Sequence, residues 1–221
     1  MPAPPEKFPA PAPDASCAEP PQPDSLVYIV DDDEAIRDSL SWLLSSRHLN
    51  VYCYASAESF LANTTPDVAG CLVLDVRMEG MSGLGLFESM RQQGYSLPVV
   101  FLSGHGDVPM AVMALKHGAF DFVEKPFNNN ELVNRVMEAM RSDRIQRQAL
   151  CRRKSLQTQL DSLSKRETQV MELVLAGKLN KLIAAELNIS MRTVEVHRAS
   201  VFEKMGVRTA VELAARLQDA S

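Results

Sequence analysis

Five short apolar runs, rich in β-branched and aromatic residues, follow one another along the first part of the chain. Helical stretches separate them, for example at 34–47, 84–92 and 108–117, where apolar positions recur three or four residues apart. Strands that alternate with helices are typical of βαβ units, whose parallel strands form a sheet covered by helices on both faces. The pattern predicts an α/β domain with a five-stranded, parallel, doubly wound sheet, its strands at 26–30, 51–54, 71–74, 99–102 and 120–123.

The rest of the chain has a helical pattern only. Asn128 and Glu131 have the spacing of a capping box and open a helix whose pattern weakens over the basic, glutamine-rich residues 141–160. Ser164 and Glu167 form a second capping box at the start of another helix. Further helices are predicted at 180–187, 191–205 and 209–219, so the last 60 or so residues form a small, compact all-α domain.

The amino-acid composition before the first strand indicates a separate segment there. Residues 1–24 are dominated by Pro and Ala and predict a disordered tail, with a proline-rich ligand for a partner domain as the alternative. We therefore expect a tail at 1–24, the α/β domain at 25–140, a partly helical linker at 141–160 and the all-α domain at 161–221. No apolar run approaches the ~18–20 residues of a transmembrane helix, and no secretory signal is recognisable. These features predict a cytoplasmic protein with no membrane partner.

The cysteines and the charges narrow the class of protein. Four scattered cysteines without a C-x-x-C pair predict neither a disulfide framework nor a zinc site. The net charge of -5 is unevenly distributed: residues 1–130 carry 7 Lys+Arg against 17 Asp+Glu, residues 131–160 carry 7 against 3, and residues 161–221 carry 9 against 8. An acidic first part and a basic to neutral second part suggest two partners of different charge.

Polar side chains follow four of the five predicted strands. They are Asp31, Asp32 and Asp33 after the first strand, Asp75 after the third, Ser103 after the fourth and Lys125 after the fifth. Ligands of open α/β sheets bind outside these carboxyl ends, so we expect most of these groups to converge. Crowded carboxylates need a cation, and hard oxygen ligands favour Mg²⁺. Asp33 by itself is better explained as the N-cap of the next helix.

The chemistry of such a pocket is phosphoryl transfer. A carboxylate held against Mg²⁺ can act as a nucleophile toward a phosphoryl donor. The phosphoryl oxygens then need a metal, an ammonium and a hydroxyl around them, and Lys125 and Ser103 supply the last two.

Four motifs resemble the receiver domain of response regulators over about residues 26–140. They are V-Y-I-V-D-D-D-E, L-V-L-D-V-R-M-x-G-M-S-G, F-L-S-G-H-G-D-V-P-M-A-V and D-F-V-E-K-P-F, and the segments G-H-G-D-V-P-M-A and E-K-P-F are similar to the FixJ branch. The sequence departs from this pattern in two places: Ser103 stands where many relatives have Thr, and Met78-Glu79 stands where Met-Pro is usual.

The resemblance implies a role for each residue of the pocket. Asp75 is the implied phospho-acceptor, and Ser103, Lys125 and Phe122 are the implied switch hydroxyl, phosphoryl-contacting cation and aromatic rotamer switch. The implied Mg²⁺ ligands are Asp31, largely through water, Asp32, Asp75 and the backbone carbonyl of Arg77. The resemblance also implies a cis peptide bond between Lys125 and Pro126. We interpret His105, in a glycine-flanked loop, as a loop residue rather than a catalytic base.

The predicted helix at 191–205 has two different faces. Val194, Val201, Phe202 and Met205 recur at helical spacing and are expected to face the core. Ser190 can cap the helix, and its opposite face carries Arg192, Glu195, Val196, Ala199 and Glu203. A recognition helix has this geometry, with its N-terminal residues against base edges, but an ordinary helical bundle fits the pattern equally well.

A second resemblance decides between these alternatives. L-S-K-R-E-x-x-V, followed by N-K-x-I-A-x-x-L-x-I-S-x-R-T-V-E-V-H-R, is similar to the LuxR-type helix-turn-helix and covers about residues 161–220. It implies insertion of the helix that starts near Met191 into the major groove of double-stranded DNA. The implied phosphate or base contacts are Lys181, Arg192, Thr193, His197 and Arg198, and the implied base-reading positions are Glu195, Val196 and Ala199.

Together the two resemblances imply a two-component response regulator and not an enzyme. Its implied partners are a sensor histidine kinase, a double-stranded DNA operator, RNA polymerase and, when phosphorylated, a second copy of itself, with activation of transcription as the output. Two other classes remain open from the residues: a phosphorelay or protein-interaction adaptor, and a metal-dependent phosphatase. The absence of a general base partnering the lone acceptor Asp75 disfavours the phosphatase.

Overall fold

A computed structural model of the protein describes residues 26–104 and 108–218, with the side chains of 108–111 left out. The predicted tail at 1–24 and His105 lie outside the described residues. The chain divides into two compact units, residues 1–146 and 147–221. The exact limits of the predicted domains stay predictions.

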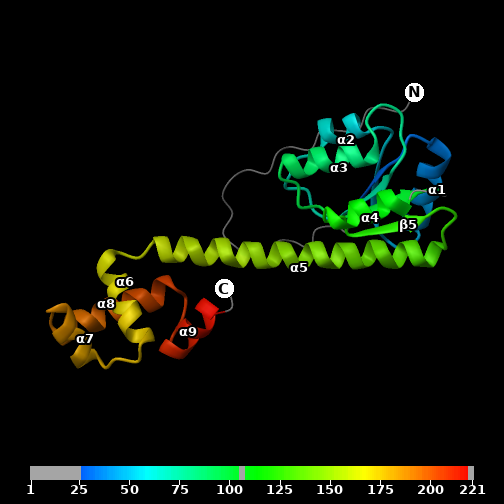
Figure 1. Cartoon of the computed structure of the whole chain (residues 1–221). Coiled ribbons are helices and arrows are strands. Elements are labelled where there is room, and N and C mark those ends of the chain that lie inside the picture. The colour runs from blue at the N-terminus through cyan, green and yellow to red at the C-terminus, as the bar shows by residue number, and fades with distance from the viewer. Residues whose placement is uncertain (1–25, 105–107, 219–221) are drawn as a thin grey trace. The chain divides into compact units, whose positions relative to one another are not determined.

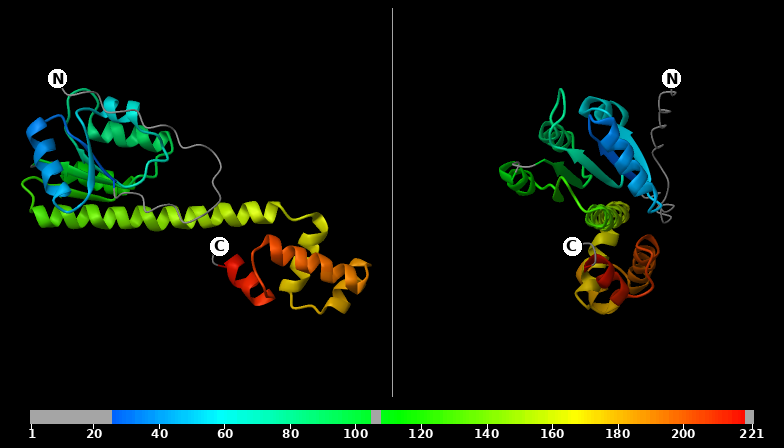
Figure 2. Two further views of the ribbon diagram at one scale, coloured as in Figure 1. Left: turned by 180° about the vertical axis from the view of Figure 1, so that it is seen from behind. Right: turned by 90° about the vertical axis from the view of Figure 1, so that its right-hand side faces the viewer.

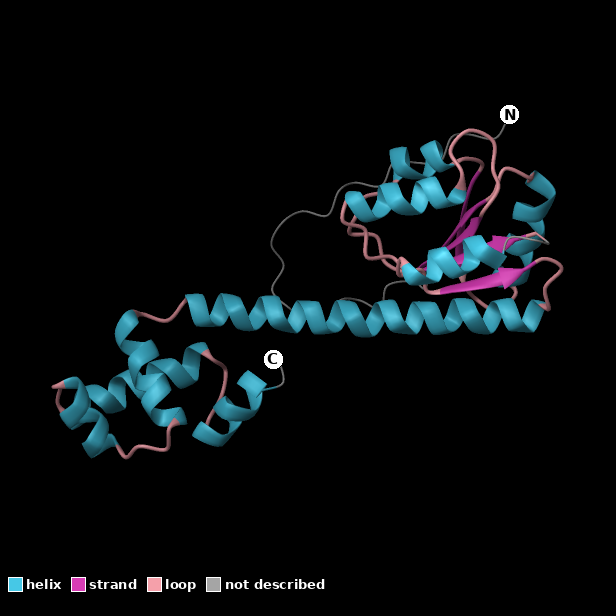
Figure 3. Ribbon diagram, in the orientation of Figure 1, coloured by secondary structure: helices cyan, strands magenta, loops and turns pink. Residues whose placement is uncertain are grey.

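The first unit is built on a five-stranded parallel sheet with the strand order β2-β1-β3-β4-β5 (Figure 1, Figure 3). This confirms the predicted α/β fold, and the strands begin and end within a residue or so of their predicted limits. The strands are β1 (Leu26–Val30), β2 (Asn50–Tyr54), β3 (Cys71–Asp75), β4 (Val99–Ser103) and β5 (Asp121–Glu124). The helices of this unit are α1 (Glu34–Ser45), α2 (Ala57–Asn63), α3 (Gly83–Gln92), α4 (Val108–Lys116) and the first part of α5 (Asn129–Asp161).

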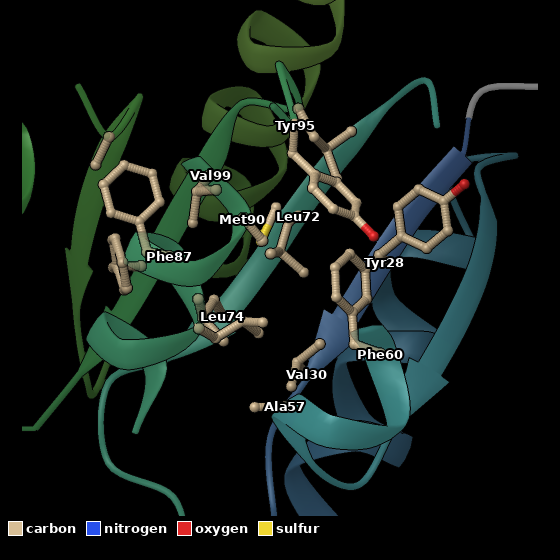
Figure 4. Packing of buried hydrophobic residues seen from close by; sticks show 14 of the residues in the cluster. Tyr28, Val30, Ala57, Phe60, Leu72, Leu74, Phe87, Met90, Tyr95 and Val99 are labelled. Atoms are coloured by element: carbon tan, nitrogen blue, oxygen red, sulfur yellow. The ribbon is translucent and has the colours of Figure 1, made fainter. Parts of the chain in front are cut away.

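Two hydrophobic clusters cover the two faces of the sheet, and the layers can be followed in Figure 2. On one face, Phe60 of α2 and Phe87 of α3 pack against alternate strand residues such as Tyr28 and Phe101. Figure 4 shows this cluster, in which the Tyr28 and Phe60 rings meet edge to face with centroids 5.9 Å apart. The other face is covered by α1 and α5. Because β3 and β4 are buried along their whole length, their ends are held rigidly in place.

Helix α5 is longer than the sequence pattern predicts. It begins after Asn128, whose side chain accepts hydrogen bonds from the backbone of Asn130 and Glu131, and it continues without a break to Asp161. Residues 141–160 were expected to be only partly helical because they lack an amphipathic pattern. They contain no Gly or Pro and many Arg, Gln and Leu, which favour the helix intrinsically. The helix end also gains tertiary contacts, since Leu156 is buried in the core of the second unit.

The second unit adds four short helices to the end of α5. They are α6 (Lys165–Leu175), α7 (Asn180–Leu187), α8 (Met191–Lys204) and α9 (Ala210–Gln218). The predicted capping box is present: the Ser164 side chain accepts from the Glu167 N–H, and the Glu167 carboxylate accepts from the Ser164 N–H. Asn188 ends α7 in the left-handed region at φ 54°. No helix in the described part of the chain combines the length and apolar composition needed to cross a bilayer.

A buried carboxylate fixes α5 to the sheet. Asp143 is 4% exposed and accepts a hydrogen bond of 2.9 Å from the Gly70 N–H, just before β3. Gly70 has φ +126°, and a Cβ built there would lie 2.0 Å from the backbone oxygen of Leu26. Both the backbone conformation and the space at this position therefore require glycine.

We expect Gly70→Ala to lower the free energy of unfolding of the first unit by about 3 kcal/mol or more, because it adds a backbone clash to a strained φ. Gly94→Ala is the matched control: φ there is +84°, but nothing lies within 4 Å of the added Cβ. It should cost only about 1–2 kcal/mol. Urea unfolding of the full chain, followed by circular dichroism, measures both. Equal losses of unfolding free energy in the two variants would mean that the close approach of position 70 to the Leu26 backbone contributes nothing to the cost.

Candidate functional site

The carboxyl ends of the strands bring the predicted pocket residues to one edge of the sheet. Asp31 follows β1, Asp75 and Ser103 are the last residues of β3 and β4, and Lys125 follows β5. The parallel register aligns these ends, since Asp75 pairs with Leu102 and Ser103 with Glu124. The predicted convergence is therefore present.

One ammonium group connects two carboxylates in this pocket. Lys125 Nζ lies 2.7 Å from Asp75 Oδ1 and 3.2 Å from Asp31 Oδ2. Asp31 is 1% exposed and Asp75 is 7% exposed, so both negative charges are withdrawn from water. The Lys125–Pro126 peptide bond is cis.

Burial and pairing move the proton affinities of these groups in opposing ways. Burial raises the pKa of Asp75, although the hydrogen bond and charge of Lys125 partly counteract this. Burial also acts to lower the pKa of Lys125, but the combined attraction of Asp75 and Asp31 is larger and raises it. Lys125 is therefore held in its charged form, facing two acids.

Three carboxylates form the candidate metal site. Asp31, Asp32 and Asp75 each offer an oxygen, and these oxygens lie within 4.8 Å of one another. The loop after β3 is bonded to two of them: the Glu79 N–H donates to Asp32 Oδ2 at 2.9 Å, and the Arg77 N–H donates to Asp75 Oδ2 at 3.2 Å. This all-oxygen donor set fits a hard divalent cation such as Mg²⁺. The role of the Arg77 carbonyl as a ligand stays a prediction.

Ser103 is the unsatisfied member of the pocket. Ser103 is 1% exposed, and its hydroxyl is the one buried side-chain polar atom without a hydrogen-bond partner among the described residues. Leaving such a group unpaired costs on the order of 1–3 kcal/mol. Its backbone oxygen accepts a 2.6 Å bond from the Lys125 N–H, so the two residues are joined across β4 and β5. Phe122 packs beside Phe101, with ring centroids 6.5 Å apart.

Two neighbours of the pocket have structural roles. Asp33 caps α1 as predicted, accepting from the Ala35 and Ile36 N–H groups, and is not among the three clustered carboxylates. Arg37, which the sequence analysis missed, donates from Nη1 to the backbone oxygen of Asp31 at 2.8 Å. Its position one turn after Asp33 on the predicted helix was the available signal.

The second candidate site is the pair of helices α7 and α8. Ser190 caps α8 by accepting from the Thr193 N–H at 3.1 Å. Val194, Val201 and Met205 are buried, and Phe202 is partly buried, as predicted. The opposite face is exposed and carries Arg192, Glu195, Val196, Ala199 and Glu203.

The remaining residues predicted to contact DNA differ in their exposure and in their bonding within the protein. Lys181 is exposed on α7, whereas Thr193 and His197 are half-buried. Arg198 is engaged within the unit: Nη1 donates to Asn180 Oδ1 at 3.0 Å, and the guanidinium lies 5.2 Å from the centroid of the Phe202 ring. Arg198 therefore joins α8 to the start of α7. Contact of any of these residues with DNA stays a prediction.

Comparison with known proteins gives matches over both units. Residues 27–137 match the family described as the response regulator receiver domain, and residues 161–217 match the luxR family of bacterial regulatory proteins. The response regulator protein TodT of Pseudomonas putida is 44% identical over 198 residues, 88% of this chain and 87% of that protein. The transcriptional regulatory protein FixJ of Bradyrhizobium diazoefficiens is 43% identical over 188 residues, 85% of this chain and 91% of that protein.

A solved structure agrees with these matches. The low-resolution structure of the response regulator StyR superposes with a TM-score of 0.83 at 39% sequence identity, over 87% of this chain and 98% of that chain.

A charged cluster stabilises the second unit and makes its stability depend on pH. Glu167, 6% exposed, accepts from Lys204 Nζ at 2.7 Å and is also bonded by Ser200 and the Ser164 N–H. The Lys204 ammonium, then the two hydrogen bonds, lower the pKa of Glu167 from 4.5 to about 2. Its contribution is therefore complete above about pH 4.5 and is lost as the pH falls toward about 2.

We expect the difference in stability between wild type and Glu167→Gln to shrink steadily between about pH 4.5 and about pH 2. Glu203→Gln removes an exposed carboxylate from α8 and is the charge-matched control. Unfolding of the full chain by urea at a series of pH values measures the differences. A wild type to Glu167→Gln difference that does not change over this range would contradict the assignment.

Proposed function

The chain belongs to the FixJ branch of the two-component response regulators, which join a receiver domain to a LuxR-type DNA-binding domain, and we propose that phosphorylation of Asp75 controls its binding to DNA. This is a family of transcription regulators rather than enzymes. A sensor histidine kinase is the proposed donor, and a double-stranded DNA operator is the proposed target.

One observation carries the proposal: the Lys125 ammonium lies 2.7 Å from the Asp75 carboxylate, and the neighbouring strand ends in Ser103, whose buried hydroxyl is unpaired. Asp75 Oδ would attack the phosphorus of a phosphohistidine, the phosphorus–nitrogen bond would break, and its electron pair would leave with the imidazole of the kinase. Asp31, Asp32, Asp75 and the Arg77 carbonyl would hold Mg²⁺. When bound, that ion supplies positive charge against the transferred oxygens.

The switch follows from the groups that the phosphoryl group would attract. It adds about -1.5 to -2 charges and three acceptor oxygens at Asp75. Lys125 Nζ is already 2.7 Å from Asp75, and the Ser103 hydroxyl is free to donate. Because Ser103 and Lys125 are bonded through their backbones, movement of one end carries the ends of both β4 and β5. The half-buried Phe122 ring on β5 would follow into the space vacated.

The output surface lies beside these two strands. Helix α4 exposes three large apolar side chains, Val112, Met113 and Leu115, at 46%, 56% and 44%. Such an apolar surface next to the switch is suited to a second copy of the same chain, so we assign it to the homodimer. Two recognition helices would then read paired half-sites through Arg192, Glu195, Val196 and Ala199. These helices would be supported by further DNA contacts from Lys181, Thr193, His197 and Arg198. The dimer would activate transcription through RNA polymerase.

We expect beryllofluoride, a phosphoryl mimic, with Mg²⁺ to convert the full-length chain from monomer to dimer, and Asp75→Asn to abolish this conversion because the acceptor carboxylate is gone. Size-exclusion chromatography with light scattering measures the mass. Asp33→Asn is the matched control, because it removes a neighbouring carboxylate but keeps the α1 cap, and it should dimerise like wild type. A wild type that stays monomeric would remove dimerisation as the output, and an Asp75→Asn protein that dimerises would remove Asp75 as the acceptor.

A further inference from the structure

Asp32 is the exposed member of the three carboxylates that form the candidate metal site. Asp31 and Asp75 are buried, and the Lys125 ammonium bonds both of them. An exposed aspartate side chain changes rotamer freely unless a bond holds it, and fixing it against a cation costs side-chain entropy. The affinity for a cation therefore depends on what holds the Asp32 carboxylate near the other two.

A backbone amide holds the Asp32 carboxylate. The Glu79 N–H donates to Asp32 Oδ2 at 2.9 Å, and a hydrogen bond to a charged acceptor is roughly twice as strong as one between neutral groups. A carboxylate has about four acceptor positions on its oxygens. Asp32 can therefore accept this bond and still offer an oxygen to a cation, so the two interactions are compatible.

Glu79 belongs to the loop between β3 and α3, residues 76–82. Arg77, whose backbone carbonyl is a proposed ligand, lies two residues before it in the same loop, and the Arg77 N–H donates to Asp75 Oδ2 at 3.2 Å. The Gly83 N–H closes the loop by donating to the Val76 backbone oxygen at 3.0 Å. The bond from Glu79 to Asp32 therefore joins two parts of the chain, after β1 and after β3, that would each supply a ligand.

The residue type at position 79 decides whether this bond can exist. The sequence has Met78-Glu79 where Met-Pro is usual, and proline has no backbone N–H to donate. The Glu79 side chain is exposed and is not one of the three clustered carboxylates. The backbone amide of Glu79, rather than its carboxylate, is therefore the group that acts on the site.

We infer that the Glu79 backbone amide is a positioning group for Mg²⁺, because it holds the Asp32 carboxylate within reach of the Asp31 and Asp75 oxygens. This rests on the proposed Mg²⁺ site and adds to it a residue that binds no metal itself. Removing a group that orients a metal ligand typically costs about 10–100-fold in metal affinity. The opposite behaviour, an amide that competes with the ion for Asp32, is separated by the experiment below.

Three variants that each remove one exposed carboxylate test this inference. Glu79→Pro removes the amide hydrogen, whereas Glu79→Ala keeps it. Glu58→Ala loosens the same loop elsewhere, because Glu58 Oε1 accepts from the Met81 N–H at 3.3 Å. The dissociation constant for MgCl₂ is measured on the full-length chain by an amide-detected NMR titration. We expect Glu79→Pro to bind Mg²⁺ about tenfold more weakly than Glu79→Ala, and Glu58→Ala to bind it like Glu79→Ala.

Hydrogen exchange of the wild type gives a second measurement that does not depend on the folding of any variant. The Glu79 amide should be protected without Mg²⁺ and at least as protected at saturating MgCl₂, since both interactions with Asp32 coexist. Equal affinities of Glu79→Pro and Glu79→Ala overturn the inference, as does an equal loss in Glu58→Ala or faster exchange of the Glu79 amide with Mg²⁺. Each of these results leaves the proposed metal site standing. A wild type that does not bind Mg²⁺ overturns the metal site and the inference together.

Discussion

The ammonium group of Lys125 bonds two carboxylates that the sheet buries, and much of the first unit is needed to keep these three charges together. Removing one partner from a buried ion pair costs about 3–5 kcal/mol, so Asp31 and Asp75 cannot be buried there unless Lys125 is delivered to the same point. The three residues come from the ends of β1, β3 and β5. A parallel sheet with aligned carboxyl ends brings these residues, far apart in the sequence, to one edge, and the fully buried strands β3 and β4 hold that edge rigidly.

The hydrogen bonding of the same pocket is incomplete at Ser103. Ser103 contributes a buried hydroxyl with no partner among the described residues, although a bond to a neighbouring acceptor would lower its energy. A group that is buried, unpaired and next to a charged pair is placed to receive an additional acceptor. Burial also raises the pKa of Asp75, and the hydrogen bond and charge of Lys125 partly counteract this. In the proposed function, additional negative charge at Asp75 would draw in Ser103, and the ends of β4 and β5 would move with it.

Residue types and their spacing were sufficient to predict the strands, the pocket and the faces of α8, because each depends on local patterns or on the rule that ligands bind at strand ends. They were insufficient where tertiary contacts determine the local structure or the partners of a side chain. Residues 141–160 have no amphipathic pattern, yet they are helical because nothing in them breaks the helix and Leu156 is buried at its end. Arg198 carries the charge expected of a phosphate contact, but its guanidinium is held by Phe202, one turn further along α8, and by Asn180 of α7, whose proximity no spacing rule reveals. Arg37 was missed although its position one turn after Asp33 was an available signal.

The charge distribution of the second unit explains why its binding to DNA can be made conditional. A helix-turn-helix that is nearly neutral and carries Glu195 and Glu203 on its exposed face would gain little from phosphate attraction, so in the proposed function one copy is expected to bind weakly. Joining two copies makes the second binding step intramolecular and doubles the phosphate contacts without changing either recognition helix. A strongly basic unit would remain on DNA whether or not its receiver was phosphorylated. Weak binding by the single copy would therefore be the property that, in the proposed function, allows a change at Asp75 to control occupancy of the operator.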